Sequence, residues 1–244
     1  MTPTTGGLSG QTVLVIGGTR GIGLATARRA RAAGAELVIT GRNIEHLDLV
    51  GGELHARTAA FDATDFDRLA ELFRDLPGSI DHVLVTGPGP YYSPLRDLDL
   101  TRVRLDLESQ LLLPIEVARN AAGKVRAGGT LLFMGGTGGR RTAPGFTMIS
   151  TLAAAKPALT RSLALELAPI RVNLIAPGFV DTPLSAELLG DQLVNRREQL
   201  RSTLPTGRVV TADDIAALAE HLMTNETLTG GTYDIDSGQQ LIDP

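Results

Sequence analysis

The chain has 244 residues, of which 43% are hydrophobic and 20% charged, and its formal net charge is −4. This composition supports one large core and excludes a disordered chain, and the acidic balance offers no binding surface for nucleic acid or anionic lipid. No apolar run reaches the ~18 residues that span a bilayer, and the first ten residues lack the basic and apolar regions of a secretory signal. The chain has no Cys, which excludes disulfides and thiolate chemistry. We therefore expect a cytoplasmic protein without nucleic-acid or membrane partners.

Short apolar runs alternate with helical patterns along the whole chain. We predict strands near residues 12–16, 36–40, 54–61, 81–85, 130–134, 171–175 and 231–235. We predict helices over 24–33, 65–76 and 150–167, and one long helix between the fourth and fifth strands. This order predicts a single α/β domain (residues 1–244) with a Rossmann-type, doubly wound, parallel seven-stranded sheet and helices on both faces. We expect residues 1–9 to be flexible and residues 185–201 to form a lid over the substrate.

The segment between the first strand and the first helix is rich in glycine. In the run from Gly17 to Gly23, Gly17 permits a tight turn, Gly21 lets the backbone approach a pyrophosphate, and Gly23 lets the helix pack close to the sheet. The free N–H groups at the helix N-terminus favour phosphate. The loop predicts a dinucleotide site, and a glycine-rich turn without a ligand is the alternative.

The end of the second strand bears on which dinucleotide is bound. NAD-specific sites place an acidic residue there to hold the ribose 2′-hydroxyl, whereas this chain has Thr40, Gly41 and Arg42. Arg42 together with Arg20 of the glycine loop suits a 2′-phosphate, which guanidinium groups bind in a bidentate manner. We therefore predict NADP(H) rather than NAD(H). The alternative is two solvated surface arginines, because nearly all basic residues of this chain are Arg.

These features, taken in order, resemble the short-chain dehydrogenase/reductase superfamily. Asp62-Ala63 resembles the pair that contacts adenine, and residues 176–182 resemble the loop that holds nicotinamide, which implies that Val180 and Thr182 face the carboxamide. Residues 163–167, 172–173, 207–209 and 230–238 also match later segments of that family. The cofactor residues implied by the glycine loop and the resemblance are Gly17, Thr19, Arg20, Gly21, Ile22, Gly23, Arg42, Asp62, Ala63, Gly87, Pro177, Gly178, Val180 and Thr182.

The catalytic residues of that family have no counterparts here, so the resemblance is to an atypical member that lacks the Ser, Tyr and Lys. In the family a Tyr exchanges a proton with the substrate oxygen, a Lys one helical turn later lowers the Tyr pKa, and a Ser holds the carbonyl. Reading without gaps between residues 131–134 and 161–164 places the Ser at Gly136, the Tyr at Ile149 and the Lys at Ala153. An Asn of an earlier helix falls on Gln110. Lys156 has Leu152, not Tyr, four residues before it, so the catalytic residues stay unassigned.

Other side chains near the predicted site have two interpretations each. Tyr91 and Tyr92 follow the fourth strand and are either groups that act on a substrate or aromatic walls of its pocket. Thr137 offers a hydroxyl or packs, and Arg140 and Arg141 receive an anionic substrate or form an exposed turn. The residues that we assign to the substrate pocket are Tyr91, Tyr92, Gly136, Thr137 and Ile149.

Two functions fit this pattern. The first is an NADP(H)-dependent oxidoreductase whose proton comes from water or from the substrate, as with a conjugated alkene or an iminium ion. The second is a non-redox protein on the same scaffold, either a nucleotide-sensing subunit or an enzyme of isomerisation or cyclisation. The four His residues are scattered, so we expect no metal. The resemblance implies a homodimer or homotetramer, because a helix with Ile215, Leu218 and Leu222, followed by the last strand, resembles segments that pair subunits in the family.

Overall fold

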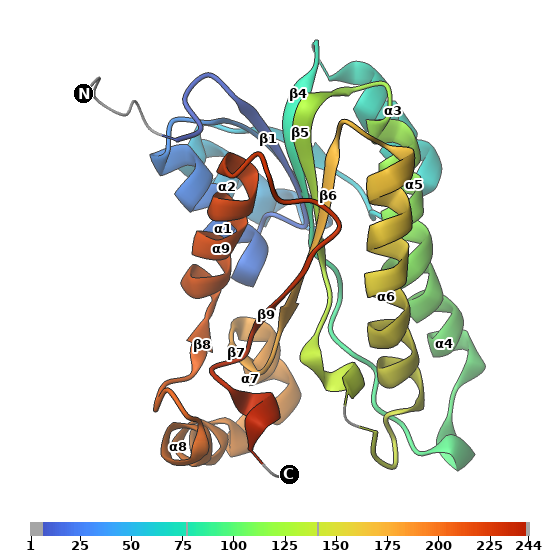
Figure 1. Ribbon diagram of the computed structural model, residues 1–244, viewed down its shortest axis with the longest axis vertical. Coiled ribbons are helices and arrows are strands. Elements are labelled where there is room, and N and C mark those ends of the chain that lie inside the picture. Colours follow the sequence, from blue (N-terminus) through green and yellow to red (C-terminus); the bar gives the residue numbers. More distant parts are fainter. Residues whose placement is uncertain (1–6, 77, 141, 243–244) are drawn as a thin grey trace.

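A computed structural model describes residues 7–76, 78–140 and 142–242, and a seven-stranded parallel sheet forms its centre (Figure 1). The strand order is β3-β2-β1-β4-β5-β6-β9, with every neighbouring pair parallel. The predicted doubly wound fold is therefore confirmed. The strands are β1 (Thr12–Ile16), β2 (Glu36–Gly41), β3 (Arg57–Ala60), β4 (Ile80–Val85), β5 (Val125–Met134), β6 (Arg171–Pro177) and β9 (Thr232–Ile235). A separate two-stranded ladder joins β7 (Val180–Asp181) to β8 (Val210–Thr211).

Helices cover both faces of the sheet (Figure 1). On one face α1 (Gly21–Ala32), α2 (Ile44–Leu54) and α9 (Ala212–Thr224) pack over one core cluster. On the other, α3 (Phe66–Asp75), α4 (Leu100–Leu107), α5 (Leu113–Ala121) and α6 (Thr147–Glu166) lie together, and α3, α5 and α6 contribute to a second core cluster. Two helices, α7 (Pro183–Leu189) and α8 (Leu193–Thr203), follow β7. Within the described residues, no helix combines the length and the apolar character needed to cross a membrane.

Two helical features depart from the predicted pattern. Helix α2 was not predicted, because its Gly51-Gly52 pair lowers helix propensity. Asn43 nonetheless caps the helix by accepting a hydrogen bond from the His46 N–H at 2.8 Å. The predicted long helix between β4 and β5 is present as α4 and α5, which a turn of π-helix, Glu108–Leu112, joins without a break in helical backbone.

Two sequence expectations concern the N-terminal and C-terminal parts of the chain. Of the segment 1–9 predicted to be flexible, residues 1–6 lie outside the described residues, and Leu8 is fully buried with its N–H donating to the Ala33 carbonyl. The stretch of α9 with Ile215, Leu218 and Leu222, followed by β9, was predicted by resemblance to pair subunits, and this stays a prediction to which Ile215 and Leu222 contribute no exposed side chain. Both are fully buried in this chain's own core against α1, with Leu218 packed beside them.

Arg171, the first residue of β6, ties that strand to the C-terminal end of α9. Its side chain is buried, and its hydrogen bonds go to backbone carbonyls. The guanidinium donates to Leu222 O at 2.6 Å, to Met223 O at 2.7 Å and to Asn225 O at 2.9 Å. It donates also to carbonyls of Gly128 and Leu228. Carbonyls at a helix C-terminus lack partners within the helix and carry partial negative charge, so this buried cation completes the end of α9.

Candidate active site

The glycine loop has the geometry that its sequence predicted. Gly17 has φ +83° and makes the turn at the end of β1. A Cβ at Gly23 would lie 2.2 Å from the Gly17 carbonyl oxygen, so only glycine lets α1 start this close to the strand. Thr19 packs against Gly41 of β2, and Ile22 is half-buried against the core. The backbone at Gly21 is open, because the nearest atom to an added Cβ would be 3.8 Å away.

The segment after β4 lies against the glycine loop. The Thr86 hydroxyl donates to the carbonyls of Ile16 and Gly17, at 3.0 and 3.1 Å. A Cβ at Gly17 would lie 2.3 Å from that hydroxyl oxygen. Gly87 follows and is exposed, next to the side chain of Gln110. The structure therefore brings the carboxyl ends of β1 and β4 together at the sheet edge where doubly wound folds bind ligands.

The segment after β6 completes this edge. Pro177 ends the strand, and the Gly178 N–H donates to the Ile235 carbonyl at 3.1 Å. Thr182 caps α7 through a reciprocal pair of hydrogen bonds with Ser185, and its Cβ is 3.8 Å from the place of a Cβ at Gly21. Val180 lies in β7, where its side chain packs against the core. The loop predicted to bind the pyrophosphate and the loop predicted to hold the nicotinamide thus meet at Gly21 and Thr182.

The residues predicted to hold the adenosine half lie on the loops after β1, β2 and β3. Arg42 is 73% exposed and its guanidinium is 3.8 Å from the Asp62 carboxylate. Asp62 accepts two hydrogen bonds from Thr64, which together with Arg42 keep the pKa of its carboxyl below the usual value. Ala63 packs against the core beside it. The structure pairs Arg20 with a different carboxylate, Glu187 of α7, at 2.7 Å.

This ion pair belongs to the segment predicted as a lid. Residues 185–201 form the end of α7, a 3₁₀ turn (Gly190–Gln192) and most of α8. Besides the Glu187 contact, Leu184 packs over the loop after β4, with side-chain atoms 3.0 Å from the place of a Cβ at Gly89. Helix α7 therefore touches both the glycine loop and the loop after β4.

The positions matched to the family's Ser, Tyr and Lys lie where β5 leads into α6. A 3₁₀ turn, Thr137–Arg140, follows β5 and packs on α6. Ile149 Cδ1 is 3.7 Å from the place of a Cβ at Gly138, and a Cβ at Gly139 would lie 2.1 Å from the Ala153 Cβ. A cavity of about 120 Å³ is lined by Gly136 and Ala153 among others. Gly136 and Ala153, at the positions matched to the Ser and the Lys, leave space there and supply no hydroxyl or ammonium group.

Both tyrosines of the predicted pocket are held by neighbouring groups. The Tyr91 hydroxyl accepts the Asp99 N–H at 3.2 Å, and the Arg102 guanidinium lies 5.7 Å from the Tyr91 ring centroid. The Tyr92 ring packs on Phe146 at 5.2 Å, and burial raises the pKa of its phenol. A raised pKa makes Tyr92 a weaker proton donor at neutral pH, which favours the aromatic-wall interpretation.

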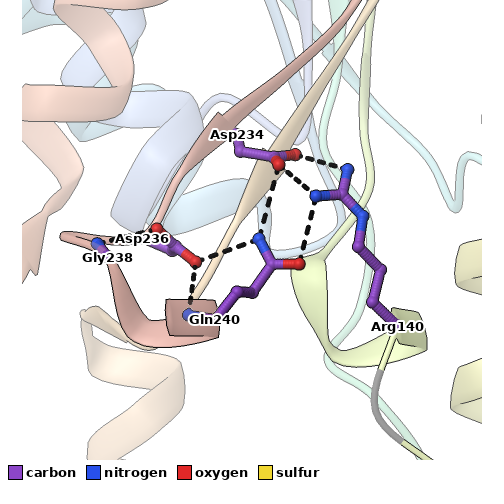
Figure 2. A network of polar contacts seen from close by, with 5 residues as sticks. All are labelled: Arg140, Asp234, Asp236, Gly238 and Gln240. Carbon is purple, nitrogen blue, oxygen red and sulfur yellow. Dashed lines mark hydrogen bonds and ion pairs between the residues drawn. The ribbon is translucent and has the colours of Figure 1, made fainter. Parts of the chain in front are cut away.

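The polar side chains of the turn after β5 are engaged elsewhere. Thr137 is 5% exposed, which is compatible with packing. Figure 2 shows Arg140 in a bidentate ion pair with Asp234 of β9 and in a hydrogen bond with Gln240. This contact joins the turn to the C-terminal segment and occupies the guanidinium that was considered for an anionic substrate. Arg141 lies outside the described residues.

One contact in the site was missed by sequence analysis. Lys156 of α6 is 7% exposed, and its ammonium donates to the Gln110 side-chain carbonyl and, at 2.9 Å, to the Met134 carbonyl. Burial lowers the pKa of Lys156 to about 8, and the Asp106 carboxylate opposes that shift. The signal in the sequence was a lone Lys at helical spacing between Leu152 and Thr160, which are also buried. In the described part of the chain, no group of three or more potential metal ligands occurs.

Comparison with known proteins places this geometry in a family. A family model described as enoyl-(acyl carrier protein) reductase matches residues 16–240. The short-chain dehydrogenase/reductase malC of Malbranchea aurantiaca is 25% identical over 96% of each chain. A solved structure of the MalC Reductase/Diels-Alderase from that organism superposes with a TM-score of 0.90 over 98% of this chain and 99% of the other. The 3-oxoacyl-[acyl-carrier-protein] reductase of Mus musculus is 30% identical over 93% of this chain and 97% of its own. A solved structure of BdcA in complex with NADPH, 25% identical and covering 96% of each chain, has a TM-score of 0.85. The chain therefore belongs to the short-chain dehydrogenase/reductase superfamily of oxidoreductases.

Proposed function

We propose that this chain is an NADP(H)-binding oxidoreductase with a non-standard active site that transfers hydride to or from a small organic substrate. The observation that carries the proposal is the contrast between the two halves of the site. The glycine loop, Thr86 and the 177–182 segment form a close-packed cradle that a Cβ at Gly17 or Gly23 would fill, which fits a dinucleotide. Gly136, Ile149 and Ala153 offer no proton donor where the family places its own.

The substrate class follows from this contrast. When bound, the nicotinamide supplies or accepts the hydride, and the protein's part is to place it and to exclude water. An acceptor that needs no proton from the protein, such as an iminium ion or a conjugated alkene, suits a site with Ile149 at the Tyr position. Tyr92, Phe146 and Leu184 would give such a substrate an apolar enclosure.

The test is an assay for loss of NADPH absorbance with a panel of ketones, enones and cyclic imines, together with the reverse reaction with NADP⁺. We expect turnover of imines or enones and little of simple ketones. Ketone reduction at the same rate as imine reduction would contradict the substrate assignment. No turnover with any member, in either direction, would contradict the oxidoreductase proposal.

A second candidate is a non-redox protein on this scaffold, serving in nucleotide sensing, isomerisation or cyclisation. It is supported by the structural similarity to MalC, which is described as a Diels-Alderase as well as a reductase. Titration of NADPH fluorescence separates the candidates further. Tight binding without turnover supports the sensing role, and absence of binding supports isomerisation or cyclisation.

We propose NADP(H) over NAD(H) because Arg42 is exposed at the end of β2, where an NAD site has an acid. Arg42→Gln is expected to raise the Kd for NADPH about tenfold and to leave the Kd for NADH unchanged, since only NADPH carries the 2′-phosphate. Fluorescence titration with both nucleotides measures this. Arg57→Gln is the matched control, because Arg57 is an exposed arginine at the amino end of β3, the opposite sheet edge. Equal weakening of both nucleotides by Arg42→Gln would contradict the assignment.

We propose that the chain forms a homodimer or homotetramer. Its support is a set of exposed leucines carried by α4, the π-turn and α6. They are Leu100 (60% exposed), Leu105 (48%), Leu112 (45%) and Leu165 (83%). Figure 1 shows α4 and α6 on the same side of the sheet. We expect light scattering at micromolar concentration to give two or four times the 25.7 kDa chain mass. A monomer mass would contradict the proposal.

A further inference from the structure

Lys156 is a buried charge that the proposed function does not use. Its ammonium lies between three elements: it projects from α6, it donates to the carbonyl of Met134 at the end of β5, and it donates to Gln110 in the π-turn. Within the described residues, these two acceptors take two of its three N–H groups. The contacts join segments that are 22 and 46 residues away from Lys156 in the sequence.

Gln110 extends this connection to the loop after β4. While its carbonyl accepts from Lys156, its amide N–H donates to the Pro88 carbonyl at 3.1 Å. A Cβ at Gly87 would lie 3.8 Å from the side-chain amide nitrogen of Gln110. Gln110 reaches this position from a turn of π-helix, a rare conformation that occurs often at functional sites. A continuous path therefore runs from Met134 through Lys156 and Gln110 to the backbone of Pro88.

This loop is also a wall of the cofactor cradle. Thr86, two residues before Pro88, is bonded to the carbonyls of Ile16 and Gly17. At the other end of this loop, Gly89 contacts Leu184 of α7. The loop is thus fixed at Thr86 by the glycine loop and at Pro88 by Gln110, and the position of Gln110 depends on Lys156.

A purely structural role is a poor explanation for a charge at this place. Burying an ammonium costs free energy, and an apolar residue of similar volume is often as stable or more stable. The charged group that faces Lys156 is Asp106 of α4, which is itself buried and whose carboxyl pKa is raised by burial. No direct hydrogen bond joins the two among the described contacts. Charge-assisted hydrogen bonds to fixed acceptors are short and directional, which suits a group that fixes the position of a loop.

We propose that Lys156 is a positioning residue of the cofactor site, which holds the loop from Thr86 to Gly89 through Gln110 so that the nicotinamide half of the dinucleotide is bound. The inference rests on the proposed function, because it assigns the loop to the cofactor. Lys156 acts through Gln110, so the effect of each residue on cofactor binding depends on the presence of the other.

The test compares Lys156→Met, Gln110→Leu and the double variant by fluorescence titration with NADPH and by thermal unfolding. We expect Lys156→Met to raise the Kd about tenfold while Tm stays equal or rises, since a charge-assisted bond is lost and a buried charge is removed. Gln110→Leu is expected to raise the Kd by a similar factor and to lower Tm, because the buried Lys156 ammonium loses one acceptor. The double variant is expected to bind no more weakly than the weaker single variant, because the two residues act in one path. Lys156→Arg, which keeps the charge, should recover most of the affinity.

The pH dependence gives a readout that simple packing would not change. The ammonium is present below its pKa of about 8 and is lost as pH rises through that value. Wild-type affinity for NADPH should therefore fall between pH 7.5 and 9.5, a range in which the 2′-phosphate, with a second pKa near 6, does not titrate. The Lys156→Met variant should show a flat profile at the weaker affinity. Asp106 is the titratable group that faces Lys156. In Asp106→Asn the affinity for NADPH should still depend on pH, because Lys156 still titrates.

Lys124→Met is the matched control, because the Lys124 ammonium also donates to a carbonyl, that of Leu76, at the far end of β5. It should bind NADPH as the wild type does. If wild type binds NADPH and Lys156→Met binds equally well, the inference is wrong and the proposed function stands. If wild type binds neither NADPH nor NADH, both are wrong. Should Lys156→Met fail to fold, Gln110→Leu decides: a folded protein with one cooperative unfolding transition and weaker binding supports the inference, and unchanged binding overturns it.

Discussion

Gly23→Ala is expected to lower the free energy of unfolding by about 2–3 kcal/mol and to weaken NADPH binding at least 100-fold. The added Cβ would lie 2.2 Å from the Gly17 carbonyl oxygen, 3.0 Å from the Gly17 carbonyl carbon and 3.1 Å from the Gly18 Cα. All three atoms belong to the backbone, so no side-chain rotation relieves the overlap. Helix α1 has to move away from the loop, and the N–H groups that face the phosphates move with it. Denaturant unfolding and fluorescence titration measure the two effects.

Gly52→Ala is the matched control for this substitution. Gly52 lies in α2, is exposed, and has no atom within 4 Å of the place of a Cβ. Alanine there should raise stability by about 0.5–1 kcal/mol, because glycine in a helix carries a larger loss of backbone entropy. If Gly23→Ala has the same free energy of unfolding and the same affinity for NADPH as the wild type, the contact between Gly23 and the Gly17 carbonyl is not as close as described.

Arg171→Met is expected to lower the free energy of unfolding by about 3 kcal/mol or more. Five backbone carbonyls would lose a buried donor, and each buried acceptor without a partner costs about 1–3 kcal/mol, reduced where water enters. The affected groups hold the end of α9 against β6, so the loss should appear in the global transition. The denaturant midpoint, with the slope unchanged, measures it.

Arg57→Met is the control for that prediction. Arg57 also opens a strand, β3, but it is exposed, so the change should stay within about 0.5 kcal/mol. Lys in place of Arg171 should recover only part of the stability, because one ammonium cannot reach all five carbonyls. If Arg171→Met unfolds with the wild-type midpoint, the guanidinium does not hold α9.

The sheet could be predicted from the sequence because its strands carry strong local signals. Runs such as Val83–Val85 and Leu131–Phe133 are buried on both faces in the parallel sheet, so they read as continuous apolar segments. The turn of the glycine loop was equally predictable, since the positive φ of Gly17 and the approach of Gly23 to the Gly17 carbonyl are local features, although Gly17 also packs against the distant Thr86.

The features that were missed depend on contacts between distant segments. Helix α2 contains two adjacent glycines, and burial of Leu47 and Val50 against the sheet overcomes their low propensity. The π-turn has no sequence signal of its own. Lys156 could not be paired with Gln110, because no spacing in the sequence indicates that residues 46 positions apart meet.

The fit of the turn after β5 against α6 bears on how such a site evolves. Any side chain at residue 139 collides with the Ala153 Cβ, and a longer side chain at 153 extends from that same Cβ. Residues 139 and 153 therefore constrain one another, because a Cβ at 139 and the Cβ of residue 153 cannot both be accommodated unless the turn or α6 moves. Substitutions at residues 139 and 153 are therefore coupled, so a larger side chain at 139 has to arise together with a shift of the turn or of α6.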